Sequence, residues 1–117
     1  MTKDEMIDSS GADTTDKRLI HDIIKAYERR LAEHHVGVWR MYLYGPHAKG
    51  NARPDSDIDL AIFLDRDEIE GFREDVELMR LRWGIDLRIE PHAFAKSDFD
   101  DMDAHIREIV TTGERIV

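Results

Sequence analysis

The order of periodic segments in this sequence predicts an α/β (α+β) fold, a small mixed β-sheet flanked by helices. Apolar residues recur at helical spacing in three segments, and short runs rich in branched and aromatic residues lie between them. Helices that alternate with strands favour a layer of helices packed on a sheet. The length of 117 residues fits one domain with a modest core. We place this domain at residues 17–117, and we expect the polar, acidic residues 1–16 to form a disordered tail.

The first helix and the first strand lead to a glycine–proline pair. The helix is expected to begin at Lys17 and to end near Gly37. Its apolar face consists of Ile20, Ile23, Ile24, Tyr27 and Leu31. The next segment, VGVWRMYLY (36–44), is typical of a strand that Gly45 and Pro46 stop. A short helix is expected to follow, because proline suits the first position of a helix.

The second strand and the helix after it are predicted from residues 58–83. The run IDLAIFLD (58–65) is apolar on both faces after its aspartates, which is typical of a central, covered strand. We expect Asp65 to cap the next helix, with Glu68 in the capping-box position. The apolar stripe of this helix is Ile69, Phe72, Val76, Met79 and Trp83. The stripe is expected to pack in the core, and any exposed part of it would suit a partner interface.

A third strand and a last helix complete the predicted order. The run IDLRIE (85–90) alternates as a strand as far as Pro91. Apolar residues at helical spacing then predict a helix over 102–110, which Gly113 ends. The residues ERIV form a short tail after it.

Composition and charge restrict the classes of function. The formal net charge of −9 disfavours direct binding of nucleic acid, which needs clustered Lys and Arg. The absence of cysteine excludes disulfides and thiol chemistry. No apolar run approaches the ~20 residues of a membrane span, and the N-terminus lacks a signal pattern, so we expect no membrane contact and a cytoplasmic location.

Two aspartates at the start of the second strand are the main candidates for chemistry. Asp57 and Asp59 lie one residue apart, so period two puts both carboxylates on one face, about 6.5–7 Å apart along the chain. That spacing suits carboxylates that share or bridge divalent metals. Asp86 on the third strand would join them if the two strands are neighbours. A structural reading remains open, because Asp55 and Ser56 make PDSD a turn-forming sequence.

The stretch LYGPHAKGNARPDSDIDLAIF (43–63) resembles the G-S-x10-D-x-D motif of the DNA polymerase β-like nucleotidyltransferase superfamily. Here Gly45 and Pro46 are followed by ten residues and then by Asp57-Ile58-Asp59. Small family members share the sequence pattern GSRARGxxRPDSDIDLxV. Further residues of this chain match that pattern: Ala48, Gly50, Arg53, Pro54, Asp55 and Ser56. Lys49 stands where arginine is usual. Asp86 matches the third carboxylate of the family, and the likeness runs from about Ile20 to the C-terminus.

The resemblance implies a polymerase β-like fold and, at this length, the minimal nucleotidyltransferase (MNT) group. Such proteins are commonly encoded beside HEPN proteins as antitoxins, and some transfer AMP from ATP to a tyrosine of the HEPN toxin. The chain would then use two Mg²⁺ ions and ATP, with a HEPN-type toxin as partner in a homo- or hetero-oligomer. Asp57, Asp59 and Asp86 would be the catalytic and metal-binding residues. Gly45, Pro46, Lys49 and Ser56 would bind the nucleotide.

Pro46 is the departure from the motif that keeps a second function open. The family serine offers a hydroxyl and a backbone N–H to the triphosphate, and proline has neither. Losing a donor to a charged group costs about 1.5–3 kcal/mol, which weakens nucleotide binding without abolishing it. The alternative is an antitoxin with weak or no catalysis that neutralises its partner by binding alone.

Several other polar residues are given weaker roles. His47 is left open as a phosphate or ribose contact, and His92 and His105 are expected at the surface. Tyr44 is expected to fill the core or to line the cleft.

Overall fold

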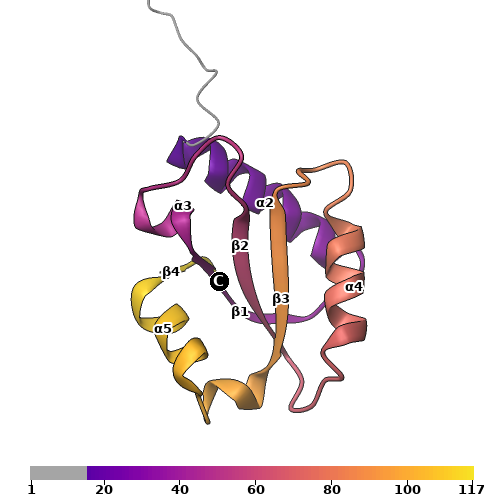
Figure 1. Cartoon of the computed structure of the whole chain (residues 1–117). Helices are drawn as coiled ribbons and strands as arrows, with labels where there is room; N and C mark the ends of the chain where they lie inside the picture. The colour runs from indigo at the N-terminus through magenta and orange to yellow at the C-terminus, as the bar shows by residue number, and fades with distance from the viewer. Residues whose placement is uncertain (1–15) are drawn as a thin grey trace, which may run out of the picture.

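A computed structural model describes residues 16–117, so the predicted tail lies outside the described residues apart from Asp16. The described elements are α2 (Lys17–Glu33), β1 (Val38–Tyr44), α3 (Pro46–Lys49), β2 (Ile58–Leu64), α4 (Phe72–Leu81), β3 (Ile89–Ala95), the 3₁₀ helix η2 (Lys96–Phe99), α5 (Ala104–Thr112) and β4 (Glu114–Arg115). Figure 1 shows the helices arranged around one sheet. The α/β fold with a small mixed sheet is confirmed.

The sheet has four strands in the order β3-β2-β1-β4. Strand β2 pairs antiparallel with β1 and parallel with β3, and β4 pairs antiparallel with β1. Six of the seven residues of β2 are buried, so β2 is the central, covered strand that its apolar sequence predicts.

Helices cover the two faces of the sheet unequally. On one face, buried residues of α2 and α4 pack against alternate residues of β1 and β2 in the larger core cluster. On the other face, Ile106 and Ile109 of α5 pack against Tyr42, Ala61 and Phe63. Within residues 16–117, no helix combines the length and the apolar character that a membrane crossing needs.

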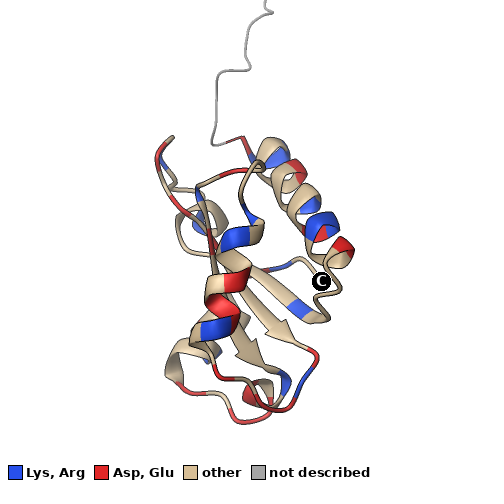
Figure 2. Cartoon of the chain, turned by 90° about the vertical axis from the view of Figure 1, so that its right-hand side faces the viewer, with Lys and Arg blue, Asp and Glu red and all other residues tan. Residues whose placement is uncertain are grey.

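Helix α4 begins later than predicted and turns a different side to the core. Its N-cap is Gly71, whose N–H donates to the Glu74 carboxylate at 2.7 Å, so the expected cap at Asp65 is wrong. The Asp65 N–H instead donates to the Gly37 carbonyl at 2.9 Å, which holds that residue in the loop. Leu78 and Leu81 are the buried residues of α4, whereas Phe72 is 77% exposed and Trp83, just beyond the helix, is 72% exposed. Helix α4 faces the viewer in Figure 2.

Strands β3 and β4 also differ from the prediction. Strand β3 begins at Ile89 and continues through Pro91 to Ala95, because an edge strand tolerates proline where its missing N–H would point away from the sheet. The short tail after Gly113 includes strand β4, which pairs with Tyr42 and Leu43 of β1. Its short length gave no periodic signal.

Candidate active site

Strand register places three polar side chains in one row across the sheet. Tyr44 of β1 lies opposite Asp59 of β2, and Asp59 lies opposite Glu90 of β3. Residues directly opposite one another share a face, so all three point to the face that α5 covers further along the strands. The row therefore occupies the end of this face where β1 finishes and where β2 and β3 begin, with Asp57 two residues before Asp59.

Negative charge is concentrated at this row. Burial, with a smaller contribution from the neighbouring carboxylates of Asp57 and Glu90, raises the pKa of Asp59 to about 6, against a lowering effect of His92. Burial also raises the pKa of Tyr44 to about 12, and the charges of Asp59 and Glu90 act in the same direction. The carboxylates repel one another, so the site would gain from a bound cation.

The loop after β1 approaches Asp59 closely. Gly45 has φ 75° and ψ −157°, a backbone conformation that is essentially restricted to glycine. A Cβ at this position would collide with Oδ2 of Asp59. Gly45 therefore allows the loop and the carboxylate to touch. The two ends of the motif that are separated by ten residues meet in space.

Pro46 starts helix α3, as expected from its fixed φ. The N–H groups of Ala48 and Lys49 both donate to the Gly45 carbonyl at 3.1 Å, and Gly50 closes the turn with φ 80°. The loop thus keeps a helical turn with proline in place of serine. Lys49 is exposed, which leaves its ammonium group accessible to a ligand.

Ser56 and His47 have structural roles in the loop before β2. The Ser56 hydroxyl accepts a hydrogen bond from the Arg53 N–H at 2.8 Å, in the turn that its sequence predicts. His47 is buried, and its Nε2 lies 3.4 Å from the Ser56 carbonyl oxygen. Burial lowers the pKa of His47. Because His47 is buried and contacts the loop backbone, it is poorly placed for the phosphate or ribose contact that its sequence position allowed.

Asp86 does not lie on β3, which corrects the prediction that it points from that strand toward Asp57 and Asp59. It lies three residues before the strand, where Oδ1 accepts from the N–H and Nε–H of Arg88 at 2.9 and 3.1 Å and Oδ2 accepts from Nη2 at 2.9 Å. These hydrogen bonds outweigh the effect of burial and lower the pKa of Asp86. Its carboxylate is occupied by Arg88.

Arg88 connects this ion pair to the turn that carries Asp57. Its Nη1 donates to the Pro54 carbonyl at 3.3 Å, and its own carbonyl accepts from the Ile58 N–H at 2.7 Å. The segment 54–58 is thus held at both ends by one residue. Asp57 is exposed and precedes the strand, so these two hydrogen bonds of Arg88 help to fix the position of its carboxylate.

Comparisons with known proteins show the family and the fold. Residues 29–117 match the family described as Polymerase beta, Nucleotidyltransferase. The chain belongs to this nucleotidyltransferase family. In structure, it is similar to a protein from Sulfolobus solfataricus described as a putative nucleotidyltransferase, with a TM-score of 0.60, 14% identity, and coverage of 78% of this chain and 81% of the other. No curated protein matches the chain in sequence.

The nucleotidyltransferase family generally uses a nucleoside triphosphate and a divalent metal. Among residues 16–117, no three His, Asp or Glu side chains are grouped closely enough to hold a metal without further ligands. Mg²⁺, however, usually takes one or two carboxylates and completes its coordination with phosphates and water. The mutually repelling carboxylates beside Gly45 fit an ion of that kind better than a protein-only cage.

Glu90 is the acid that the structure places beside Asp59 and that the sequence reasoning did not select. Glu90 and His92 alternate along β3 with the buried Ile89 and Pro91, so both face the same side as Asp59. Alternation through Pro91 was the signal that could have revealed them. His92 is half-buried beside the carboxylates, whereas His105 is exposed, as expected, with its ring 6.2 Å from that of Tyr44.

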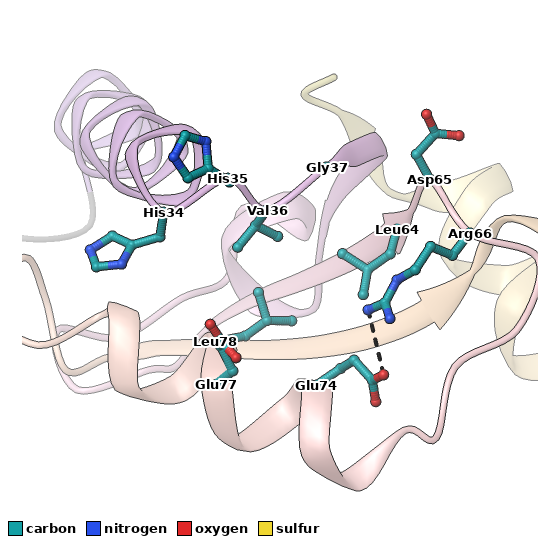
Figure 3. Close-up of a pocket in the computed structure, with 10 residues that line it drawn as sticks. All are labelled: His34, His35, Val36, Gly37, Leu64, Asp65, Arg66, Glu74, Glu77 and Leu78. Carbon is teal, nitrogen blue, oxygen red and sulfur yellow. Dashed lines mark ion pairs between the residues drawn. The ribbon is translucent and has the colours of Figure 1, made fainter.

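A cavity of about 450 Å³ lies at the other end of β2 (Figure 3). Leu64, Asp65 and Arg66 line it together with residues of α4 and the loop after α2, and Arg66 forms an ion pair with Glu74 at 3.4 Å. The length of β2 separates this cavity from Asp59 by about 20 Å. It is therefore distinct from the carboxylate row.

Proposed function

We propose that this protein is an Mg²⁺-dependent nucleotidyltransferase of the MNT type, which transfers AMP from ATP to a HEPN-type toxin. The observation that carries the proposal is the row of Asp59 and Glu90, with Asp57 just before it and Gly45 in contact with the Asp59 carboxylate. This arrangement combines neighbouring carboxylate oxygens with a glycine turn that lets the loop touch one of them.

The residues have separate tasks in this proposal. Asp57 and Asp59 hold the divalent metal, and Glu90 takes the place that the sequence suggested for Asp86. The metal, when bound, neutralises charge on the triphosphate and on the departing pyrophosphate. The pKa of Asp59 is raised to about 6 in the absence of metal, so a bound cation would favour its ionised form. Lys49 is placed on the loop to contact phosphate oxygens.

The transfer itself needs an oxygen nucleophile in line with the bond that breaks. The acceptor hydroxyl forms a bond to the α-phosphorus of ATP, the bond from that phosphorus to the bridging oxygen breaks, and pyrophosphate leaves. One of the row carboxylates accepts the proton of the acceptor hydroxyl. Positioning and charge neutralisation supply most of the rate enhancement in such reactions.

A HEPN-type toxin is the proposed acceptor because the motif of the chain resembles that of the minimal group. The net charge of −9 would complement a basic RNA-binding partner and would speed its association. Charge alone does not select one acceptor among basic proteins, so the acceptor needs a direct test.

The second candidate is an antitoxin that binds its partner without transferring a nucleotide. Pro46 favours it, because this position offers neither an N–H nor a hydroxyl to the triphosphate. The neighbouring carboxylates of Asp59 and Glu90 favour the enzyme, because like charges side by side at a half-buried strand start reduce stability unless they serve a ligand.

Nucleotide binding is tested by thermal unfolding. ATP with Mg²⁺ at millimolar concentration is expected to raise the melting temperature of the wild type, and Asp57→Asn is expected to remove the rise. Asp55→Asn, which changes an aspartate of the preceding turn, is the matched control and should keep it. A wild type with no shift would count against a nucleotide site.

The acceptor is tested by incubating the protein with the neighbouring HEPN-type partner and ATP, followed by intact-mass measurement. A mass increase of one AMP on the partner supports the enzyme. A stable complex whose partner gains no mass supports the pure binder instead.

A further inference from the structure

An exposed apolar surface lies on helix α4, away from the carboxylate row. We define the α4 face as Phe72, Val76, Met79 and Trp83 with the charged residues Glu70, Arg73, Glu77 and Arg80. Phe72 and Trp83 are 77% and 72% exposed, and Val76 is 41% exposed. Isolated exposed apolar residues need no explanation, but a contiguous group of large ones marks an interaction site. Phe, Trp, Met and Arg are also the residues that interfaces concentrate.

The apolar residues of this face follow a coiled-coil spacing. Phe72, Val76, Met79 and Trp83 are separated by four, three and four residues, with Trp83 just beyond the end of α4. Ile69, which continues this spacing before the helix, packs against the core instead. This spacing is the a/d pattern of a seam between two helices rather than the wider stripe of a helix that packs on a sheet. Helix α4 already uses Leu78 and Leu81 to pack on its own core. The seam is therefore left without a helix to face within residues 16–117.

The charged residues beside the seam alternate in sign. In chain order they are Glu70, Arg73, Glu77 and Arg80, and together with Phe72 and Val76 they line one groove. Glu70 and Arg73 form an ion pair at 3.2 Å, which confirms that neighbours in the row are within reach of one another. Figure 2 shows both acidic and basic turns along α4.

Two copies of this charge row are complementary when they run antiparallel, because each acidic residue then lies opposite a basic one. In an antiparallel pair related by a two-fold axis, Glu70 of one copy faces Arg80 of the other, and Arg73 faces Glu77. Each contact then occurs twice, as a two-fold interface requires. A parallel pair in register would instead bring like charges together.

We propose that the α4 face binds the α4 face of a second copy of this chain, as an antiparallel helix pair. The seam supplies the buried apolar contact, and the charge row sets direction and register. A protein with a net charge of −9 repels itself at long range, so a locally neutral patch is the surface through which two copies can meet. The pairing leaves the carboxylate row open on each copy and is independent of the proposed nucleotidyl transfer.

The test measures the oligomeric state of the full chain by sedimentation and light scattering at physiological salt. The wild type is expected to show twice the chain mass of 13.7 kDa at concentrations up to about 100 μM, where interfaces of standard size are occupied. A wild type that stays monomeric over this range would overturn the proposal. Phe72→Ser is expected to weaken the dimer at least tenfold.

Charge reversal tests the antiparallel register directly. Arg73→Glu with Arg80→Glu makes the row acidic, and Glu70→Arg with Glu77→Arg makes it basic, so each variant alone is expected to be monomeric. An equimolar mixture should restore a dimer that contains one copy of each. All four side chains are exposed, so both variants should keep the wild-type circular dichroism spectrum. Lys25→Glu with Arg29→Glu, on the exposed face of α2, is the control for the same charge change and should stay dimeric. A mixture that remains monomeric, or an acidic variant that still dimerises, would refute the pairing.

Discussion

Gly45→Ala tests whether the loop and Asp59 form one unit. The residue has φ 75° and ψ −157°, and any side chain in that region costs about 1–3 kcal/mol. The added Cβ also collides with the Asp59 carboxylate, and overpacking of this kind costs about 1–3 kcal/mol more. For a domain of this size the combined loss of about 2–6 kcal/mol corresponds to a fall in melting temperature of about 10 °C or more.

Gly50→Ala is the matched control, because it introduces the backbone strain of a positive φ but no collision. Gly50 also has a positive φ, 80°, but a Cβ there has no heavy atom within 4 Å. We expect a loss of about 1–2 kcal/mol, with any stabilisation by Mg²⁺ and ATP retained. In Gly45→Ala that stabilisation should disappear, because the carboxylate must move.

A double-mutant cycle separates the collision from the backbone strain. With Asp59→Ala, the atom nearest to the new Cβ becomes the Cβ of residue 59, at an ordinary 3.5 Å. Gly45→Ala should therefore cost less in the Asp59→Ala background than in the wild type, by about 1–3 kcal/mol in chemical denaturation. Equal costs in both backgrounds would refute the contact between Gly45 and Asp59.

Three further changes test the electrostatics and the loop. The folded protein holds the Asp59 proton more tightly than the unfolded chain does, so this contribution to stability is complete below the ordinary pKa of 3.8 and is lost as the pH rises through about 6. Asp59→Asn in EDTA should accordingly stabilise the protein at pH 7.5 by about 1–2 kcal/mol, after the shift is discounted for solvent screening of this half-buried group, and give no gain near pH 3.5. A pH-independent difference in melting temperature would contradict the raised pKa. Pro46→Ser should tighten calorimetric binding of ATP by up to about 150-fold, and an unchanged affinity would show that this position does not contact the phosphates. Arg88→Leu removes the partner of Asp86 and the hydrogen bond to Pro54. We expect the free energy of unfolding to fall by about 2 kcal/mol and amide exchange over residues 54–58 to become faster. Unchanged exchange would show that Arg88 does not hold this segment.

The order of elements could be predicted because each core-facing element repeats its apolar residues with one period. Ile20, Ile24, Tyr27 and Leu31 keep helical spacing, and they are the buried residues of α2. Helix α4 carries two apolar patterns, and the longer one, from Ile69 to Trp83, is mostly exposed while Leu78 and Leu81 face the core. Periodicity reveals that a helix has an apolar face, but it does not reveal which of two faces the sheet will cover.

The candidate site could be predicted as far as one continuous motif reaches. Gly45, Asp57 and Asp59 lie within fifteen residues of one another, and chain connectivity alone brings them near the same strand ends. The identity of the third acid depends on the register between β2 and β3, which cannot be predicted from the local sequence of either strand. Asp86 matches the third carboxylate of the family motif. The pairing of Ile58 with Ile89, however, places Glu90 beside Asp59. Arg88 then takes up the carboxylate of Asp86.

The carboxylate row lies where one strand ends and two others begin, and this has a consequence for engineering. Two connections border the row: the connection from β1 to β2, which carries α3, and the turn before β3. Each contributes one partly buried residue to the larger core cluster, Ala48 from the first and Ile85 from the second. New acceptor or nucleotide preferences can therefore be sought by exchanging exposed residues within 49–55, while the strands keep Asp59 and Glu90 in place.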